Sequence, residues 1–316
     1  MVAEHPPKSR SLGIDAAALA ALVERAANVV SENARRFFET EFVPYALAEP
    51  GFFTGYYEPE VAGSLTRTAG LTVPLHRPPA DLVEVEPGSV AGLDPSFRFA
   101  RKTAAGLAEH HDRAAVMAGA LEGQNLEFVW LRDPVDAFFI HVQGAARIRL
   151  PDGARLRVTY AAKSGHPYTP IGRVVADRAG VPREAVTMQT IRAWLAAHPD
   201  EMPAVLAANR SYIYFREAPV SDAALGPIAA AKVPLTPCRS LAVDRLVHTF
   251  HAPIWIETML PSGRAFYRLM VAQDTGSAIV GPARGDIFFG SGDAAGEIAG
   301  AMRAPGRFVV LMPRAR

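Results

Sequence analysis

Two carboxylates, Asp274 and Asp286, lie within one glycine-rich segment that reads DTGSAIVGPARGDIFFGSG over residues 274–292. Glycines allow a backbone to approach a ligand closely, so this segment is expected to form a loop at a site. The apolar run at 287–289 follows Asp286 directly. Apolar surroundings raise the pKa of a carboxyl, as a general acid near neutral pH requires. Asp286 is therefore the candidate general acid, and the competing interpretation is that it caps a turn or pairs with Arg284.

A second segment combines aromatic rings, a hydroxyl and acids. Residues 51–60 read GFFTGYYEPE and contain Thr54, Tyr56 and Tyr57. Tyrosines stack on apolar faces and also form hydrogen bonds, which is the combination that a saccharide site uses. The segment is accordingly interpreted as a sugar subsite, with a half-buried strand edge as the alternative.

Gln143 and Gly144 offer a further polar contact for a sugar. They follow the run FIHV, which is expected to be a strand. An amide both donates and accepts hydrogen bonds, so Gln143 could bind a hydroxyl or an acetamido group. The alternative is an ordinary solvated glutamine at the end of a strand.

The sequence gives little support for a metal site, a serine nucleophile or a phosphate-binding loop. The pairs His110-His111 and His248-His251 have no third ligand at a recognised spacing, and Cys238 is the only cysteine, so no metal site is predicted. Neither a Gly-x-Ser-x-Gly elbow nor a Gly-x-x-x-x-Gly-Lys phosphate loop occurs. The residues therefore predict no metal site and show no motif for an organic cofactor.

Composition sets the broad class. The chain has 316 residues, enough for two domains, and its 33 basic and 32 acidic residues give no field that would attract nucleic acid. Its first ten residues, MVAEHPPKSR, lack the apolar run of a secretory signal. On this evidence the protein is either cytoplasmic or has lost a targeting segment.

Hydrophobic patterns predict a mainly β protein with peripheral helices rather than a doubly wound sheet. Expected helices cover Asp15–Phe38, Ala104–Leu121, Met188–Ala197, Met202–Asn209 and Ala294–Met302. Expected strands cover Glu127–Leu131, Ala137–Val142, Arg147–Leu150, Arg155–Tyr160, Tyr212–Phe215, Ile254–Met259, Ala265–Val271 and Phe308–Met312. The turn Pro151-Asp152-Gly153 indicates a hairpin, and the Pro- and Ala-rich stretch 221–237 indicates a domain boundary.

Six ordered motifs together resemble the MltA family of membrane-bound lytic transglycosylases, from about Gly51 to the end of the chain. They are TGYYEP at 54–59, WLRDPVD at 130–136 with VQG at 142–144, YAAKSGHPY at 160–168, NRSY at 209–212, LTPCRSLAVD at 235–244, and the segment 274–292. The family often continues Gln-Gly with Ser-Gly, whereas this chain has Ala145-Ala146.

The resemblance implies roles for individual residues. The three aspartates that name the family's C-terminal 3D domain correspond to Asp244, Asp274 and Asp286. Asp286 is the implied catalytic residue and Asp274 its supporting acid. The implied sugar-binding positions are Thr54, Tyr56, Tyr57, Gln143 and Gly144, together with Asp244.

The resemblance also implies a fold: a double-psi β-barrel plus a second, smaller β-barrel-like domain, with a substrate groove between them. Residues 1–65 would supply the N-terminal helix and the first part of the barrel. Residues 66–225 would form the inserted domain, and residues 226–316 would complete the barrel.

The implied activity is that of a lytic exotransglycosylase, a carbon–oxygen lyase that acts on peptidoglycan glycan strands. It would cut between N-acetylmuramic acid and N-acetylglucosamine and leave 1,6-anhydromuramic acid ends, with one aspartate as general acid and base. The resemblance further implies a periplasmic monomer, with outer-membrane association through an N-terminal lipoprotein segment that this sequence lacks.

The sequence is also compatible with two other functions. Asp274-Thr-Gly-Ser277 is also the active-site sequence of pepsin-like aspartic peptidases, but their shared proton needs a second such motif, which this chain lacks. A non-catalytic, expansin-like peptidoglycan-binding protein would use a similar barrel to bind without cutting. Both rank below catalysis, because Asp274 and Asp286 both stand in the family's glycine setting.

Overall fold

The computed structural model describes residues 14–48, 50–220 and 222–314. These residues form two compact units. One unit joins the N-terminal part of the chain, through Tyr57, to the part from Asp222 onward, and the other is Glu58–Ser221. The predicted boundaries, after residues 65 and 225, lie eight and four residues later along the chain.

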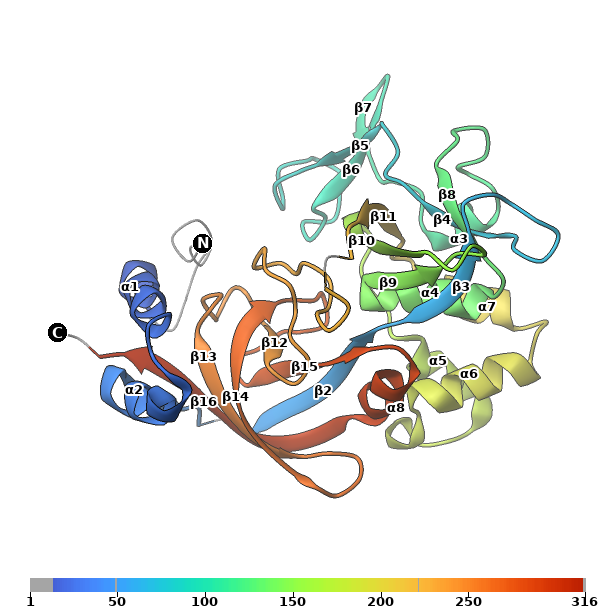
Figure 1. The fold of residues 1–316 in the computed structure, drawn as a ribbon. Helices are drawn as coiled ribbons and strands as arrows, with labels where there is room; N and C mark the ends of the chain where they lie inside the picture. Colours follow the sequence, from blue (N-terminus) through green and yellow to red (C-terminus); the bar gives the residue numbers. More distant parts are fainter. Residues whose placement is uncertain (1–13, 49, 221, 315–316) are drawn as a thin grey trace. The chain divides into compact units, whose positions relative to one another are not determined.

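Within the described residues, the first unit contains a closed six-stranded β-barrel (Figure 1). The ring runs β16-β13-β14-β12-β15-β2 and closes through the pairing of β16 with β2. Its strands are β2 (Gly51–Glu58), β12 (Ser240–Val243), β13 (Pro253–Met259), β14 (Ala265–Asp274), β15 (Arg284–Ser291) and β16 (Arg303–Pro313). The predicted class, mainly β with a barrel and peripheral helices, is confirmed.

Alternation of side chains along the strands fills the barrel. On β2, Phe53 is fully buried and its ring stacks on Phe308 of β16 at 6.0 Å between centroids. Burying an aromatic or aliphatic side chain of this size contributes roughly 1.5 to 3 kcal/mol. Other fully buried side chains of the barrel strands are Leu241, Val243, Ile254, Ile256, Met270, Ile287 and Val310.

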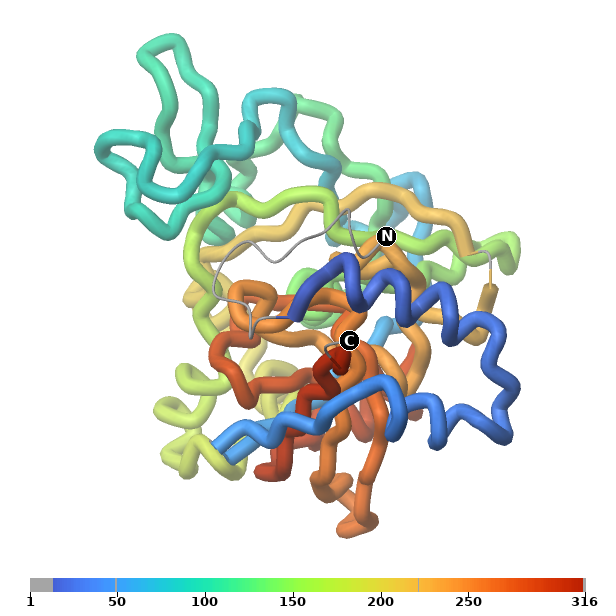
Figure 2. Tube along the Cα trace, turned by 90° about the vertical axis from the view of Figure 1, so that its left-hand side faces the viewer, coloured from blue at the N-terminus to red at the C-terminus, as the bar shows by residue number. Residues whose placement is uncertain are grey.

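The N-terminal helices lie beside the barrel's last strand. Helix α1 (Ala16–Ala26) contacts β16, and α2 (Ala34–Glu41) precedes β1 (Phe42–Ala46), which pairs with β16 (Figure 2). The single helix predicted over Asp15–Phe38 is wrong, because a 3₁₀ turn, η1 (Ser31–Asn33), separates two helices. Asn28 and the β-branched pair at 29–30 favour helix weakly, which accounts for the break.

The second unit is built on a six-stranded sheet with the order β11-β10-β9-β3-β8-β4 among the described residues. Its strands are β3 (Glu60–Ser64), β4 (Val73–His76), β8 (Glu127–Leu131), β9 (Ala145–Arg149), β10 (Arg155–Lys163) and β11 (Ile213–Ala218). The predicted hairpin is confirmed, since β9 and β10 pair antiparallel and Asp152 accepts from the backbone N–H of Ala154 in the turn. A separate three-stranded sheet contains β5 (Leu82–Glu84), β6 (Phe99–Thr103) and β7 (Gly106–Ala108).

The strand predicted over Ala137–Val142 is wrong: these residues belong to helix α4 (Pro134–Gln143). Asp133 caps this helix, and Pro134 occupies its first turn. One side of α4 packs on the sheet through Ile140, and another packs on α5 (Ile171–Ala179) through Phe138. A helix that is apolar on two sides loses the one-sided periodicity by which sequence analysis recognises helices.

The helix predicted over Ala104–Leu121 is also wrong for most of its length. Gly106, with φ of 119°, forms the tight turn into β7, and the helix proper is α3 (Arg113–Met117), capped by Asp112. The other three predicted helices lie close to their expected ranges: α6 (Met188–Ala197), α7 (Met202–Ala207) and α8 (Asp293–Ala301). Helix α5 was not predicted.

Buried histidines should make this protein acid-sensitive. Burial is the largest cause that lowers the pKa of His76 and His110 and holds that of His141 well below its usual range, although Glu127 and Asp81 partly oppose it for the first two. Below about pH 6.5 the unfolded chain binds protons that the folded chain does not, so the free energy of unfolding should fall as the pH decreases.

The expected loss is up to about 1.4 kcal/mol per pH unit for each histidine over the window between its unfolded and folded pKa values. Urea unfolding at about pH 7.5 and at about pH 5 measures this loss. Equal free energies of unfolding at the two pH values would contradict the prediction.

Candidate active site

The barrel brings Asp274 and Asp286 to the two sides of one residue. Ala242 of β12 pairs with Asp274 at the end of β14 and with Asp286 in β15. Neighbouring strands lie about 4.8 Å apart, so the two Cα atoms are about 10 Å apart with both side chains on one face. The predicted glycine loop is therefore correct only for the connection 275–283, because both acids lie in strands.

Thr54 of β2 binds the Asp286 carboxyl. Its hydroxyl donates to Asp286 Oδ1 at 2.5 Å and accepts from Arg284 Nη2 at 2.6 Å. Burial is the largest effect on Asp286 and raises its pKa, while the charge of Arg284 and the Thr54 hydrogen bond oppose that rise. Asp286 thus has the property expected of a general acid, and Arg284 reaches it through Thr54.

Asp274 has different partners. The Tyr56 hydroxyl donates to Asp274 Oδ2 at 3.0 Å, and the backbone N–H of Ala230 donates to Oδ1 at 3.3 Å. Burial raises the pKa of Asp274 to about 6; hydrogen bonds from Thr275, Ala230 and Tyr56 limit the rise, and the charge of Asp286 adds to it. Burial, with the charges of both acids, raises the pKa of Tyr56 well above its usual value, so Tyr56 stays a donor.

Thr54 and Tyr56 reach the acids because alternate residues of β2 share a face. Tyr57 points to the other face, is 7% exposed and packs against Gly296 of α8. A Cβ on Gly55 would lie 2.6 Å from the ring of Phe289, so glycine permits this close packing. The structure therefore brings Thr54 and Tyr56, but not Tyr57, to the acid pair.

Asp244 acts on a loop rather than at the acid pair. Its carboxylate is 8% exposed and accepts hydrogen bonds from the backbone N–H groups of Leu246, at 2.9 Å, and Gly281, at 2.8 Å. The second bond fixes the connection between Asp274 and Asp286. The geometry makes Asp244 a support for that loop.

Replacing Asp244 by alanine should therefore loosen the 275–283 connection. Two partly buried amides lose their acceptors, which costs about 0.5 to 1.5 kcal/mol each. Hydrogen exchange at Gly281 should accelerate, while exchange in the sheet of the second unit stays unchanged. An unchanged exchange rate at Gly281 would show that Asp244 does not hold the loop.

Gln143 and Gly144 belong to the second unit. Gln143 is the last residue of α4, not the end of a strand, and Gly144 caps that helix with φ of 77°. The backbone N–H of Gly144 donates to Ile140, and its carbonyl accepts from the N–H of Tyr160 at 2.7 Å. Their sugar-binding role stays a prediction.

One contributor to the site was missed by the sequence analysis. The backbone N–H of Ala230 binds Asp274, yet Ala230 lies in the stretch interpreted as a domain boundary. A backbone donor carries no side-chain signal, and its position depends on the path of the loop. Neither residue type nor spacing in the sequence indicates this contact.

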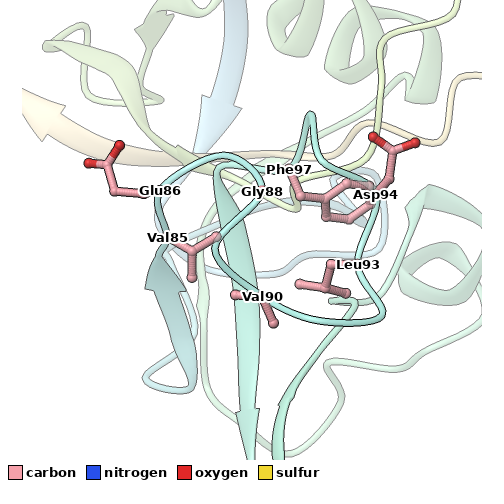
Figure 3. Close-up of a pocket in the computed structure, with 7 residues that line it drawn as sticks. All are labelled: Val85, Glu86, Gly88, Val90, Leu93, Asp94 and Phe97. Atoms are coloured by element: carbon pink, nitrogen blue, oxygen red, sulfur yellow. The ribbon is translucent and has the colours of Figure 1, made fainter.

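A surface depression on the loop between β5 and β6 offers no comparable chemistry. Figure 3 shows its lining, in which the carboxylates of Glu86 and Asp94 point away from the apolar centre. Asp94 is bound by the N–H and hydroxyl of Ser96. No group of three or more His, Cys, Asp or Glu residues in the described ranges is placed to hold a metal ion.

Two protein-family models match this chain, and the second of them covers both acids. The MltA specific insert domain model matches residues 52–216, and the 3D domain model matches residues 239–312. The chain belongs to the MltA family. Its relatives include membrane-bound lytic murein transglycosylase A of Escherichia coli K12, 33% identical over 270 residues, which are 82% of this chain and 65% of that protein. The Vibrio cholerae protein of the same name is 32% identical over 62% of this chain and 54% of its own length.

Solved structures of MltA proteins share the fold. A membrane-bound lytic murein transglycosylase from Agrobacterium tumefaciens superposes with a TM-score of 0.90 at 50% identity, covering 98% of this chain and 88% of that one. Neisseria gonorrhoeae MltA gives a TM-score of 0.78 at 34% identity, covering 93% and 83%. Escherichia coli MltA with bound chitohexaose gives 0.73 at 27% identity, covering 95% and 84%. This chain thus spans just under two thirds of its Escherichia coli curated relative and most of each structure.

Proposed function

We propose that this MltA-family chain is a peptidoglycan lytic transglycosylase, with Asp286 as its general acid and base. The observation that carries the proposal is the pair of separately held carboxyls: Asp286 on Thr54, and Asp274 on Tyr56 and Ala230. The names of its relatives, and the chitohexaose bound to Escherichia coli MltA, support a glycan substrate. The substrate bond would be the β-1,4 link between N-acetylmuramic acid and N-acetylglucosamine.

One acid is enough for this reaction. A glycoside hydrolase ordinarily uses two carboxylates, one as acid and one as nucleophile or base for water. Here the C6 hydroxyl of the muramic acid is tethered to the reacting sugar, so its attack on C1 is intramolecular and needs no external nucleophile. Protonated Asp286 donates to the leaving glycosidic oxygen, and its carboxylate then accepts the C6 hydroxyl proton.

Asp274 would support Asp286 electrostatically. A charged Asp274 would favour the protonated form of Asp286 by like-charge repulsion, and the same repulsion is among the causes that raise the pKa of Asp274. Thr54, Tyr56, Tyr57, Gln143, Gly144 and Asp244 remain the proposed sugar-binding set. For Asp244 and the buried Tyr57, the contacts described above support an indirect role, through the shape of the site.

The setting proposed for the reaction is the periplasm, with membrane association. The support is the name of the curated relatives, which are membrane-bound. No helix in the described ranges has the length and apolarity needed to cross a bilayer. The monomeric state and the groove between domains stay predictions.

Product chemistry tests the proposal. Purified peptidoglycan is digested with the protein, and the soluble products are treated with borohydride before mass spectrometry. Anhydro ends resist reduction, so unreduced 1,6-anhydromuropeptides are expected. Reducible ends would identify a hydrolase, and binding without soluble products would identify an expansin-like protein. A peptidase would instead release peptides, and a pepstatin-type inhibitor would block it.

A further inference from the structure

Arg284 lies two residues before Asp286 on β15, on the same strand face. Its guanidinium is fixed by more than the Thr54 contact. Nη1 donates to the carbonyl of Gly285 at 2.5 Å and to that of Phe52 at 3.3 Å, and the group lies over the Phe52 ring, 5.2 Å from its centroid. Arg284 is thus held by both strands that carry the acid and its hydroxyl partner.

The direction of the hydrogen bonds follows from the groups involved. A guanidinium has five N–H donors and no acceptor, so Arg284 must donate into a lone pair of the Thr54 oxygen. A hydroxyl has only one proton. With one of its two lone pairs bound by Arg284, the Thr54 oxygen directs its proton to Asp286 Oδ1; in the alternative, in which it accepts from both Arg284 and a protonated acid, that proton would lose this acceptor.

We propose that Arg284 is a positioning residue that, through the Thr54 hydroxyl, fixes Asp286 Oδ1 as a hydrogen-bond acceptor and reserves Oδ2 for the catalytic proton. Among the described residues, Thr54 is the side chain that donates to this carboxyl, and it occupies one oxygen. The acid proton is consequently carried by the other oxygen. The role of this proton in catalysis rests on the proposed function, whereas the titration that tests the hydrogen bonding of Asp286 does not.

The proton balance of the reaction gives Arg284 its role. The Oδ2–H bond breaks as the glycosidic oxygen gains the proton and the C1–O bond breaks. The C6 oxygen then bonds to C1, and its proton returns to Oδ2. Between these steps Asp286 is a carboxylate, and the charge-assisted hydrogen bond from Thr54 stabilises it. Arg284 strengthens that bond by polarising the hydroxyl.

The charge of Arg284 already lowers the pKa of Asp286 against the effect of burial. Removing Arg284 should therefore raise that pKa and keep the acid protonated to higher pH. A residue that only supported the fold would not shift the titration in this direction. The shift expected for loss of a nearby opposite charge is about 1 pH unit.

The test is a titration of the Asp286 carboxyl by carbon-13 NMR in the full chain, with its signal assigned by its absence in Asp286→Asn. The variants are Arg284→Met, Thr54→Val, Thr54→Ser and the Arg284→Met/Thr54→Val double variant. Arg303→Met is the matched control, because Arg303 also lies over the Phe52 ring, at 5.9 Å, but is not among the charges that shift Asp286.

Arg284→Met and Thr54→Val should each raise the pKa of Asp286 by about 1 unit, and Thr54→Ser and Arg303→Met should leave it within about 0.3 unit of wild type. In the Thr54→Val background, Arg284→Met should add a smaller shift than in the wild type, because the part of its effect that passes through the Thr54 hydroxyl is already lost and only the direct effect of its charge remains. Equal shifts in both backgrounds would overturn the proposal by showing that Arg284 acts as an independent charge. So would an unchanged pKa in Arg284→Met.

Activity provides a second readout. In Arg284→Met the alkaline limb of kcat/KM for peptidoglycan should move up with the titration, and Thr54→Ser should keep the wild-type limb. If Arg284→Met does not fold, Thr54→Val still decides whether the hydroxyl through which Arg284 would act affects Asp286, and an unchanged pKa of Asp286 in Thr54→Val would overturn the proposal. If the wild-type protein releases no anhydro products, the proposed function fails, while the carboxyl titration still decides the role of Arg284.

Discussion

Replacing Asp286 by asparagine is expected to slow the release of anhydromuropeptides by about 10²- to 10⁴-fold, the range typical of losing a general acid and base. Asparagine keeps the shape of the side chain and an oxygen that can accept from Thr54 at Oδ1. It has no proton to give to a glycosidic oxygen and cannot take one from the C6 hydroxyl. The fold should therefore be preserved while the reaction is lost.

The matched control is Asp293→Asn, which makes the same chemical change at an exposed aspartate in the first turn of α8. Initial rates of product release by liquid chromatography measure both variants, and near-ultraviolet circular dichroism checks their folds. The control should keep the wild-type rate. An Asp286→Asn rate within about threefold of wild type would remove Asp286 from the mechanism, since a general acid is worth far more.

Replacing Glu58 by glutamine is expected to have the largest effect on stability. Glu58 is 1% exposed and accepts from Arg147 Nε at 2.8 Å, from Arg157 Nε at 2.6 Å and from Arg157 Nη2 at 3.1 Å. Both arginines are buried as well. Neutralising the carboxylate removes the negative charge that both guanidinium groups contact in a poorly solvated place, which typically costs about 3 to 5 kcal/mol.

The control for Glu58 is Glu39→Gln, which removes an exposed ion pair with Arg35 on α2 and should change the free energy of unfolding by less than about 1 kcal/mol. Thermal unfolding, followed by circular dichroism, compares the two variants with wild type. Similar small shifts in Tm for both variants would contradict a large stabilising effect of the buried ion pairs between Glu58 and its two arginines.

Glu58 comes directly after Tyr56 and Tyr57 in the sequence. These buried ion pairs therefore hold the chain in place at the end of the segment that contains the two tyrosines.

The sequence predicted which residue types carry the chemistry of the site, but it did not predict the hydrogen bonds between them. The acids and Thr54 could be singled out by residue type and by motif. The hydrogen bond between Thr54 and Asp286 joins residues 232 positions apart, so only the closed barrel brings them together. The acceptor role of Asp244 is likewise tertiary, because its partner Gly281 is 37 positions away.

Hydrophobic patterns gave wrong helix and strand predictions where an element is buried on two sides, or where turns interrupt a stretch with helical periodicity. Helix α4 is apolar towards both the sheet and α5, which removed its helical signature and led to a strand prediction that also misplaced Gln143. Of the barrel strands, β13 and β14 lie close to their predicted ranges and β16 begins earlier than predicted, whereas β12 was not predicted and β15 was predicted as part of a glycine loop. The buried cluster around Glu58 gave no signal, because charged residues in a strand are ordinarily solvated.

The most direct measurement of the central claim is digestion of peptidoglycan in heavy-oxygen water, followed by mass spectrometry of the products of the wild type and of Asp286→Asn. If the C6 hydroxyl is the nucleophile, wild-type products carry anhydro ends without heavy oxygen, and the variant releases almost none. Heavy oxygen at newly formed reducing ends would show that water attacks C1, and would contradict the assignment of Asp286 as the single acid and base of a lytic transglycosylase.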